Sequence, residues 1–208
     1  MITGVDFVSS IEKTLKRINL YSQENIEKFL EAIRTYESKY NNYNVNDYLY
    51  HLEKYLEIKL NTDFLDIFFD ELKHCIPKEN IKLINTIKKL SQKYELVLLT
   101  NYFKKSQLNR LNNMKIGKYF IECYGENLIK PNEMSYIKAC GNNKPNECIM
   151  IGDNLNLDIK SAKKVGLNTI YVNSKNILIN EDITKVNKVE DITIELINII
   201  ENKGDKNE

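Results

Sequence analysis

Two aspartates that follow a short apolar run are the residues of this sequence best placed to do chemistry. The run 148–151 has the character of a buried strand, and Gly152 and Asp153 follow it directly. Asp158 comes five residues after Asp153, near the expected start of the next helix. Carboxylate oxygens grouped in this way suit Mg²⁺, which takes hard oxygen ligands and keeps several waters. The alternative is that the two aspartates only cap that helix.

Three further strand ends carry polar residues, and each has an ordinary structural explanation. Asp6 ends the first short strand, where an aspartate is more often a cap or turn residue. Thr100 and Asn101 follow a buried strand, where such residues often cap a helix. Lys130 precedes a proline that is expected to start a helix, and most lysines are solvated surface charges. Ligands of open α/β sheets bind beyond the carboxyl ends of the strands, so a site is expected at these positions.

The elements that must position these residues alternate between helix and strand in the second part of the chain. Apolar residues at helical spacing over 81–90 precede the apolar run 95–99, which is predicted to be a buried strand. Further helices are predicted near 104–112, 133–139, 157–165 and 192–200, and further strands near 119–124, 148–151 and 169–172. This order predicts an α/β fold in which helices cover both faces of a parallel sheet.

The segment 11–79 has a different character. Its apolar residues recur at three- and four-residue spacings between Lys and Glu, and no part of it is a convincing strand. Residues 1–8 are predicted to form a short strand ahead of it. We therefore expect one α/β domain built from residues 1–10 and 80–208, with a helical domain inserted at 11–79. A length of 208 residues fits one large domain or one domain that carries an insertion.

Composition and charge exclude several classes of protein. Thirty basic and 29 acidic residues give a formal charge of +1, so the chain lacks the broad basic field of a nucleic-acid-binding protein. It has neither a signal-peptide pattern nor an apolar run of the ~20 residues that cross a bilayer. Four cysteines without a CxxC pair and two histidines supply a zinc site poorly. We expect a cytoplasmic protein that binds neither nucleic acid nor membranes.

Taken together, the strand-end motifs resemble those of the haloacid dehalogenase-like hydrolase superfamily. The motifs are Asp6, Leu-Leu-Thr-Asn at 98–101, Lys-Pro at 130–131 and Gly-Asp-Asn-x-x-x-Asp at 152–158. The resemblance is good over residues 80–175 and partial over residues 1–10. It implies a Rossmann-like, three-layer core domain with a parallel sheet, and it identifies residues 11–79 as an all-helical cap domain.

The resemblance implies a phosphatase mechanism and a role for each motif residue. Asp6 would be the nucleophile that forms an aspartyl-phosphate. Thr100 and Asn101 would donate hydrogen bonds to the phosphoryl oxygens, and Lys130 would neutralise their charge. The implied ligands of a Mg²⁺ cofactor are Asp6, the backbone carbonyl of Val8, Asp153 and Asp158. The implied substrate is a small phosphorylated metabolite, and we expect a monomer or a homodimer.

The first motif departs from the family pattern at Val8. Phosphatases of the family have Asp-x-Asp-x-Thr, whose second aspartate protonates the leaving group and then activates water. This chain has Asp-Phe-Val-Ser-Ser at 6–10, and valine cannot transfer a proton. Such proton transfer contributes about 10²–10⁴-fold to a rate. We therefore expect poor turnover of alkyl phosphate esters and a smaller effect on leaving groups that need no proton.

Three functions stay open on the sequence alone. The first is a Mg²⁺-dependent phosphatase that is slow or restricted in its substrates. The second is a non-catalytic relative that binds a phosphorylated ligand in the same pocket. The third is a dehalogenase-like hydrolase, because those members also lack the second aspartate. Dehalogenases do not need the metal, so the retained Asp153 and Asp158 favour the first function over the third.

Overall fold

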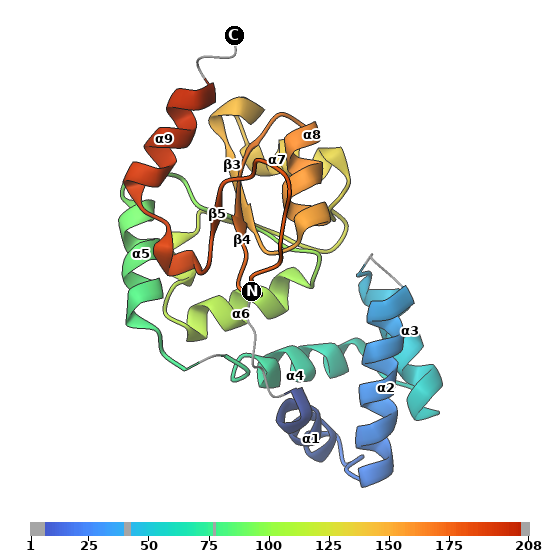
Figure 1. Ribbon diagram of the computed structural model, residues 1–208. Coiled ribbons are helices and arrows are strands. Elements are labelled where there is room, and N and C mark those ends of the chain that lie inside the picture. Colours follow the sequence, from blue (N-terminus) through green and yellow to red (C-terminus); the bar gives the residue numbers. More distant parts are fainter. Residues whose placement is uncertain (1–6, 40–42, 77, 205–208) are drawn as a thin grey trace.

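The computed structural model describes residues 7–39, 43–76 and 78–204 of the chain. Four helices pack together at one end of the molecule, and the strands lie among the other helices at the opposite end (Figure 1). The four helices, here called the helical region, are α1 (Phe7–Arg17), α2 (Gln23–Lys39), α3 (Val45–Leu56) and α4 (Thr62–Leu72). Within the described ranges, no helix is both long and apolar enough to span a membrane.

Asparagine side chains begin many of the helices. Asn44, Asn61 and Asn80 each accept hydrogen bonds from backbone N–H groups in the first turn of α3, α4 and α5. Asn132 and Asn154 do the same for the helical segments that follow them. These N–H groups have no partner within the helix, so a capping asparagine stabilises each helix by about 1 kcal/mol. The frequent asparagines thus determine where helices start.

A single apolar cluster holds the helical region together. Its buried members are Ile11, Leu15, Ile26, Phe29, Ala32, Ile33, Tyr36, Tyr48, Leu52, Leu56, Phe64, Leu65, Phe68, Phe69, Leu72, Cys75 and Phe103. The ring centroid of Phe29 lies 5.5 Å from that of Phe64 and 5.0 Å from that of Phe68. Each large side chain that is fully buried here contributes about 1.5–3 kcal/mol. Tertiary packing therefore stabilises these helices.

The rest of the chain alternates between helices and short parallel strands. The elements are α5 (Ile81–Ser91), β1 (Val97–Leu99), α6 (Lys104–Asn113), β2 (Glu122–Tyr124), α7 (Glu133–Cys140), β3 (Ile149–Gly152), a π-helical segment (Leu155–Lys160), α8 (Ser161–Lys164), β4 (Asn168–Val172), β5 (Lys185–Val186) and α9 (Ile194–Gly204). Strand β1 pairs with β2, and β3 pairs with β4, which pairs with β5. Every one of these pairings is parallel.

Alternate residues of β3 reach the two helical layers. Ile149 and Ile151 pack in a cluster with residues of α5 and α9. Met150, between them, packs in a second cluster with residues of α7 and α8. Successive side chains of a strand point to opposite faces, so the two clusters lie on the two faces of the strands. Figure 1 shows α5 and α9 on one side of these strands and α7 and α8 on the other. The predicted fold class, an α/β core of three layers with a helical region, is confirmed.

The prediction of a strand over residues 1–8 is wrong at its last two residues. Phe7 and Val8 are the first residues of α1. Phe7 packs against the same apolar cluster as Ile11 and Leu15. These three residues are four apart in sequence and therefore share one face of a helix. Residues 1–6 lie outside the described residues, and the division at 10/11 and 79/80 stays a prediction.

Candidate functional site

Lys130 and Asp158 form a buried ion pair near the carboxyl ends of the strands. Lys130 Nζ lies 2.5 Å from Asp158 Oδ1, and the two side chains are only 11% and 7% exposed. Asp158 Oδ2 accepts a hydrogen bond of 2.9 Å from the backbone N–H of Asn154. A charge buried without a partner costs several kcal/mol. Removal of either member would therefore leave the other as an unpaired buried charge.

Gly152 leaves the space that the Asp158 side chain occupies. A Cβ atom at position 152 would lie 2.2 Å from Asp158 Cβ and 2.3 Å from both Cγ and Oδ2. These distances are far shorter than any contact between atoms that are not bonded, so a side chain at position 152 would displace the carboxylate. Asp158 itself lies in the π-helical segment that Asn154 caps. The glycine at the end of β3 and the asparagine after it thus position Asp158.

Asn101 holds the backbone of Lys130 with both ends of its side-chain amide. Asn101 Nδ2 donates to Lys130 O at 2.8 Å, and Asn101 Oδ1 accepts from Lys130 N at 2.8 Å. This pair of hydrogen bonds ties the loop after β1 to the segment after β2. A direct contact of Asn101 with the substrate stays a prediction. The structure shows its side chain engaged with Lys130, which is a positioning role that the sequence did not indicate.

Thr100 lies at the end of β1 with a hydroxyl that can still donate. Its N–H donates to Tyr124 O at 2.9 Å, and its Oγ1 accepts from the N–H of Tyr102 at 3.1 Å. A threonine hydroxyl has one hydrogen to donate in addition to its acceptor lone pairs. That hydrogen is suited to bind an oxygen of an anion, and the phosphoryl-binding role of Thr100 stays a prediction.

Asp153 is exposed at the end of β3 and lines a small hollow. The hollow measures about 90 Å³, and its lining includes Tyr171, Ser174 and Lys175. Within the part of the chain that the structure describes, the Asp153 carboxylate has neither an ion pair nor a hydrogen bond. An exposed carboxylate with free oxygens can bind a hard cation that keeps most of its waters, as Mg²⁺ does. The donor chemistry of Asp153 therefore fits Mg²⁺.

The structure gives less information on two of the predicted metal ligands, Asp6 and Val8. Asp6 lies outside the described residues, and within the ranges 7–39, 43–76 and 78–204 no three His, Cys, Asp or Glu side chains form a group that could hold a metal. Val8 lies in the first turn of α1, with its side chain 39% exposed. The carbonyl of a helical residue accepts a hydrogen bond from the N–H four residues further on, which leaves one lone pair free. The roles of Asp6 and Val8 stay predictions.

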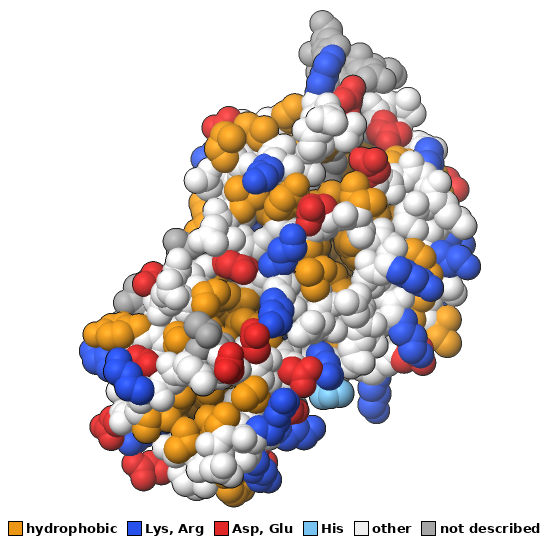
Figure 2. Space-filling view, turned by 180° about the vertical axis from the view of Figure 1, so that it is seen from behind, with side chains coloured by type: hydrophobic (Ala, Val, Ile, Leu, Met, Phe, Trp, Pro, Cys, Tyr) orange, Lys and Arg blue, Asp and Glu red, His pale blue; other side chains and the backbone are white. Residues whose placement is uncertain are grey.

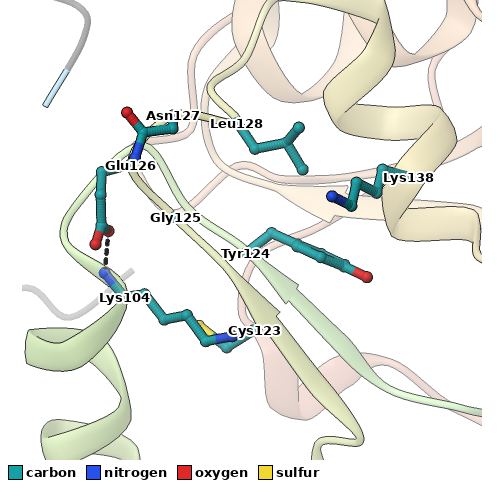
Figure 3. Close-up of a pocket in the computed structure, with 8 residues that line it drawn as sticks. All are labelled: Lys104, Cys123, Tyr124, Gly125, Glu126, Asn127, Leu128 and Lys138. Atoms are coloured by element: carbon teal, nitrogen blue, oxygen red, sulfur yellow. Dashed lines mark hydrogen bonds between the residues drawn. The ribbon is translucent and has the colours of Figure 1, made fainter. Parts of the chain in front are cut away.

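A second, larger hollow lies beside β2, and none of the predicted site residues lines it. It measures about 220 Å³ and is lined by Lys104, Cys123, Tyr124, Gly125, Glu126, Asn127, Leu128 and Lys138. Figure 3 shows the Glu126 carboxylate turned toward the backbone N–H of Lys104, which donates to it. Burial raises the pKa of the Cys123 thiol to about 11, so it is protonated at neutral pH and unsuited to act as a nucleophile. The strand ends that carry Thr100, Asp153 and the buried ion pair are therefore the candidate site.

Charges outside the site are mixed in sign. On the face of the molecule in Figure 2, basic side chains are interspersed with acidic ones over both regions.

Arg110 of α6 is a buried charge. It is 5% exposed, and its Nε donates to Cys75 O at 3.2 Å. Burial lowers the pKa of Arg110. The sequence does not indicate that this arginine is buried, because charged residues of a helix usually lie on the protein surface.

A family model described as haloacid dehalogenase-like hydrolase matches residues 6–172. No curated protein matches the sequence significantly. The matched range contains all of the predicted site residues and most of both regions of the fold.

Solved structures of the same fold cover nearly the whole chain. A HAD phosphatase from Thermococcus onnurineus is 18% identical, with a TM-score of 0.61 over 93% of this chain and 87% of that one. The HAD-hydrolase YfnB from Bacillus subtilis, bound to magnesium, is 17% identical, with a TM-score of 0.58 over 94% and 93%. A 2-haloacid dehalogenase from Pseudomonas syringae is 16% identical, with a TM-score of 0.64 over 96% and 94%. At these identities the likeness shows the fold, and the match of the family model to most of the sequence shows the family. The chain belongs to the haloacid dehalogenase-like hydrolase family.

Proposed function

We propose that this protein is a Mg²⁺-dependent phosphatase that hydrolyses a small phosphorylated metabolite through an aspartyl-phosphate on Asp6. The observation that carries the proposal is the buried Lys130–Asp158 pair, which Asn101 and Gly152 hold in place. A buried ion pair contributes little net stability, and well-packed apolar residues of similar volume are often as stable or more so. Two charges kept at this cost beyond the strand ends favour a role in chemistry.

The side chains divide the work of phosphoryl transfer among them. The Asp6 carboxylate is ionised at neutral pH and attacks phosphorus without a base. A bond forms between its oxygen and phosphorus as the bond to the leaving group breaks, and water later hydrolyses the aspartyl-phosphate. The Lys130 ammonium has three donors, of which Asp158 takes one, so others can bind the phosphoryl oxygens together with the Thr100 hydroxyl.

Asp153 and Asp158 would hold Mg²⁺ together with Asp6 and the Val8 carbonyl. Asp153 has free oxygens, and each Asp158 oxygen keeps lone pairs beyond those used by Lys130 and Asn154. When bound, the ion would stabilise negative charge on the phosphoryl oxygens. The related Bacillus subtilis hydrolase, described as bound to magnesium, supports this assignment.

Val8 restricts the substrates that can be used. No carboxylate stands at position 8 to give a proton to the leaving group, which must depart as an anion. Aryl and acyl phosphates meet this condition, whereas alkyl phosphate esters do not. Replacing Val8 with Asp should therefore raise the rate on alkyl esters much more than on aryl esters, by up to about 10²-fold.

Turnover of p-nitrophenyl phosphate by the purified protein tests the proposal. We expect hydrolysis that requires Mg²⁺ and stops on chelation, and Asp6→Asn should abolish it. Asp66→Asn is the matched control, because Asp66 is an exposed aspartate of α4 whose ion pair, in the described part of the chain, is with Lys105. Turnover that survives Asp6→Asn would exclude Asp6 as the nucleophile.

Val8 is also consistent with two other functions, phosphate-ligand binding without turnover and dehalogenation, and each has its own measurement. A protein without any proton donor at position 8 could bind a phosphorylated ligand and not turn it over. Thermal stabilisation by phosphate without hydrolysis would support that function. A halide also leaves without a proton, so release of halide from a 2-haloacid would support dehalogenation.

A further inference from the structure

The residue at the start of α6 breaks the usual rule for that position. Helix N-caps favour Ser, Thr, Asp or Asn, whose side chains accept hydrogen bonds from the first turn. Phe103 stands at this position and its side chain makes no capping bond. It is instead fully buried. A local rule broken in this way often marks a site with another requirement.

The Phe103 ring lies inside the helical region. Its centroid is 5.2 Å from that of Tyr43, 5.1 Å from that of Tyr48 and 5.0 Å from that of Phe69. All other buried members of this cluster within the described residues precede position 76. Phe103 is therefore the buried side chain by which the strand-containing region enters the core of the helical region.

The opposite side of the same segment is held by the end of β2. A Cβ atom at Gly125 would lie 2.7 Å from Tyr102 O and 2.8 Å from Lys104 N, so the two backbones are in direct contact. Glu126 accepts a hydrogen bond from the Lys104 N–H, which is the first free N–H of α6 (Figure 3). Residues 102–104 are thus fixed between the aromatic cluster and the loop after β2.

A short series of contacts leads from this segment to the buried ion pair. Asn101 is two residues before Phe103, and its side chain makes both hydrogen bonds to the backbone of Lys130. Lys130 in turn pairs with Asp158. Movement of Phe103 would be passed along the chain to Asn101 and from there to Lys130.

We infer that Phe103 is a positioning residue, through which the packing of the helical region determines where Asn101 holds Lys130. The effect on turnover rests on the proposed phosphatase function, whereas the link from Phe103 to the Lys130 backbone does not depend on it. Misplacement of a catalytic group by about 1 Å can cost about 10²-fold in rate. A small shift at Phe103 should therefore reduce kcat more than it raises KM.

Two equivalent substitutions in the same cluster separate positioning from stability. Phe103→Leu removes the ring that enters the core of the helical region. Phe68→Leu is the matched control, since Phe68 is also fully buried in the cluster and its ring contacts are with Phe29 and Phe69. Both variants should lower the melting temperature to a similar extent. Hydrogen exchange of the Lys130 amide, which donates to Asn101, reports the predicted link without any substrate.

We expect at least tenfold faster exchange of the Lys130 amide in Phe103→Leu, and no change at this amide in Phe68→Leu. The kcat for p-nitrophenyl phosphate should fall about tenfold or more in the first variant only. Equal exchange of the Lys130 amide in the two variants would overturn the inference. If Phe103→Leu fails to fold, Phe103→Met and Phe68→Met replace the pair, because methionine fills irregular apolar space. Absence of turnover in the natural protein would refute the phosphatase proposal, and the exchange measurement would still decide the role of Phe103.

Discussion

The helical region and the strand-end site are stabilised in different ways. Aromatic and aliphatic side chains hold helices α1–α4 in one cluster. The site is held by a chain of hydrogen bonds that runs from Asn101 through Lys130 and Asp158 to Asn154. Apolar packing has no preferred direction and tolerates changes that conserve volume, whereas a buried charge network fails when one partner is removed. We therefore expect stability and activity to be affected together in the site but separately in the helical region, except at Phe103, which connects the two.

The largest effect is expected from Lys130→Met. The substitution leaves the Asp158 carboxylate buried without its cation, which should lower the free energy of unfolding by about 3–5 kcal/mol and abolish turnover. The double variant Lys130→Met/Asp158→Leu removes both charges and should recover most of the stability but none of the activity. Urea unfolding of both variants measures this difference. If Lys130→Met lowered the free energy of unfolding by less than ~1 kcal/mol, Lys130 and Asp158 would not form a buried charge network.

Phe29→Ala tests the helical region, and it should lower the free energy of unfolding by a similar amount. Phe29 is fully buried between Phe64 and Phe68, and its truncation should cost about 3–5 kcal/mol. Its ring has no contact with Phe103 or with the site in the described chain. Turnover per folded molecule should therefore stay within about twofold of that of the natural protein. A large fall in kcat at a temperature where the variant is fully folded would contradict the separation of the two regions.

The smallest effect is expected from Glu53, a half-buried carboxylate on α3 of the helical region. A hydrogen bond from the Leu60 backbone and, next, the Lys59 side chain lower the pKa of Glu53. A carboxylate with a lowered pKa stabilises the folded state above its ordinary pKa, and this contribution is lost as the pH falls through the lowered value. The difference in stability between the natural protein and Glu53→Gln should thus be present at neutral pH and vanish in acid. Thermal unfolding at several pH values measures it, and a difference that is constant with pH would exclude this cause.

The sequence predicts the local parts of this structure well. The spacing of apolar residues identifies the strands and helices that surround the site. Burial of one face of an element makes apolar residues recur with the period of that element. The segment 152–158 follows β3 as predicted, and Gly152 has the close contact that its position suggests. Strand β5 has only two residues, too few to show a period.

Long-range partners could not be predicted in the same way. The periodic pattern marks Phe103 as apolar but does not show that it joins the cluster of a distant segment. An asparagine after a strand suggests a helix cap, and only the folded chain shows that Asn101 binds the backbone of Lys130. Phe7 and Val8 are β-prone apolar residues, yet both are helical, and Phe7 packs in the cluster that contains Ile11. In each case tertiary contacts override a local preference.

Phosphorylation of Asp6 during turnover tests the central claim most directly. The protein is mixed with p-nitrophenyl phosphate and Mg²⁺ and quenched in acid, and the peptide that contains Asp6 is analysed by mass spectrometry. We predict one phosphoryl group on Asp6 in the natural protein and none in Asp6→Asn. Hydrolysis without labelling at Asp6, or labelling that persists in Asp6→Asn, would contradict the account.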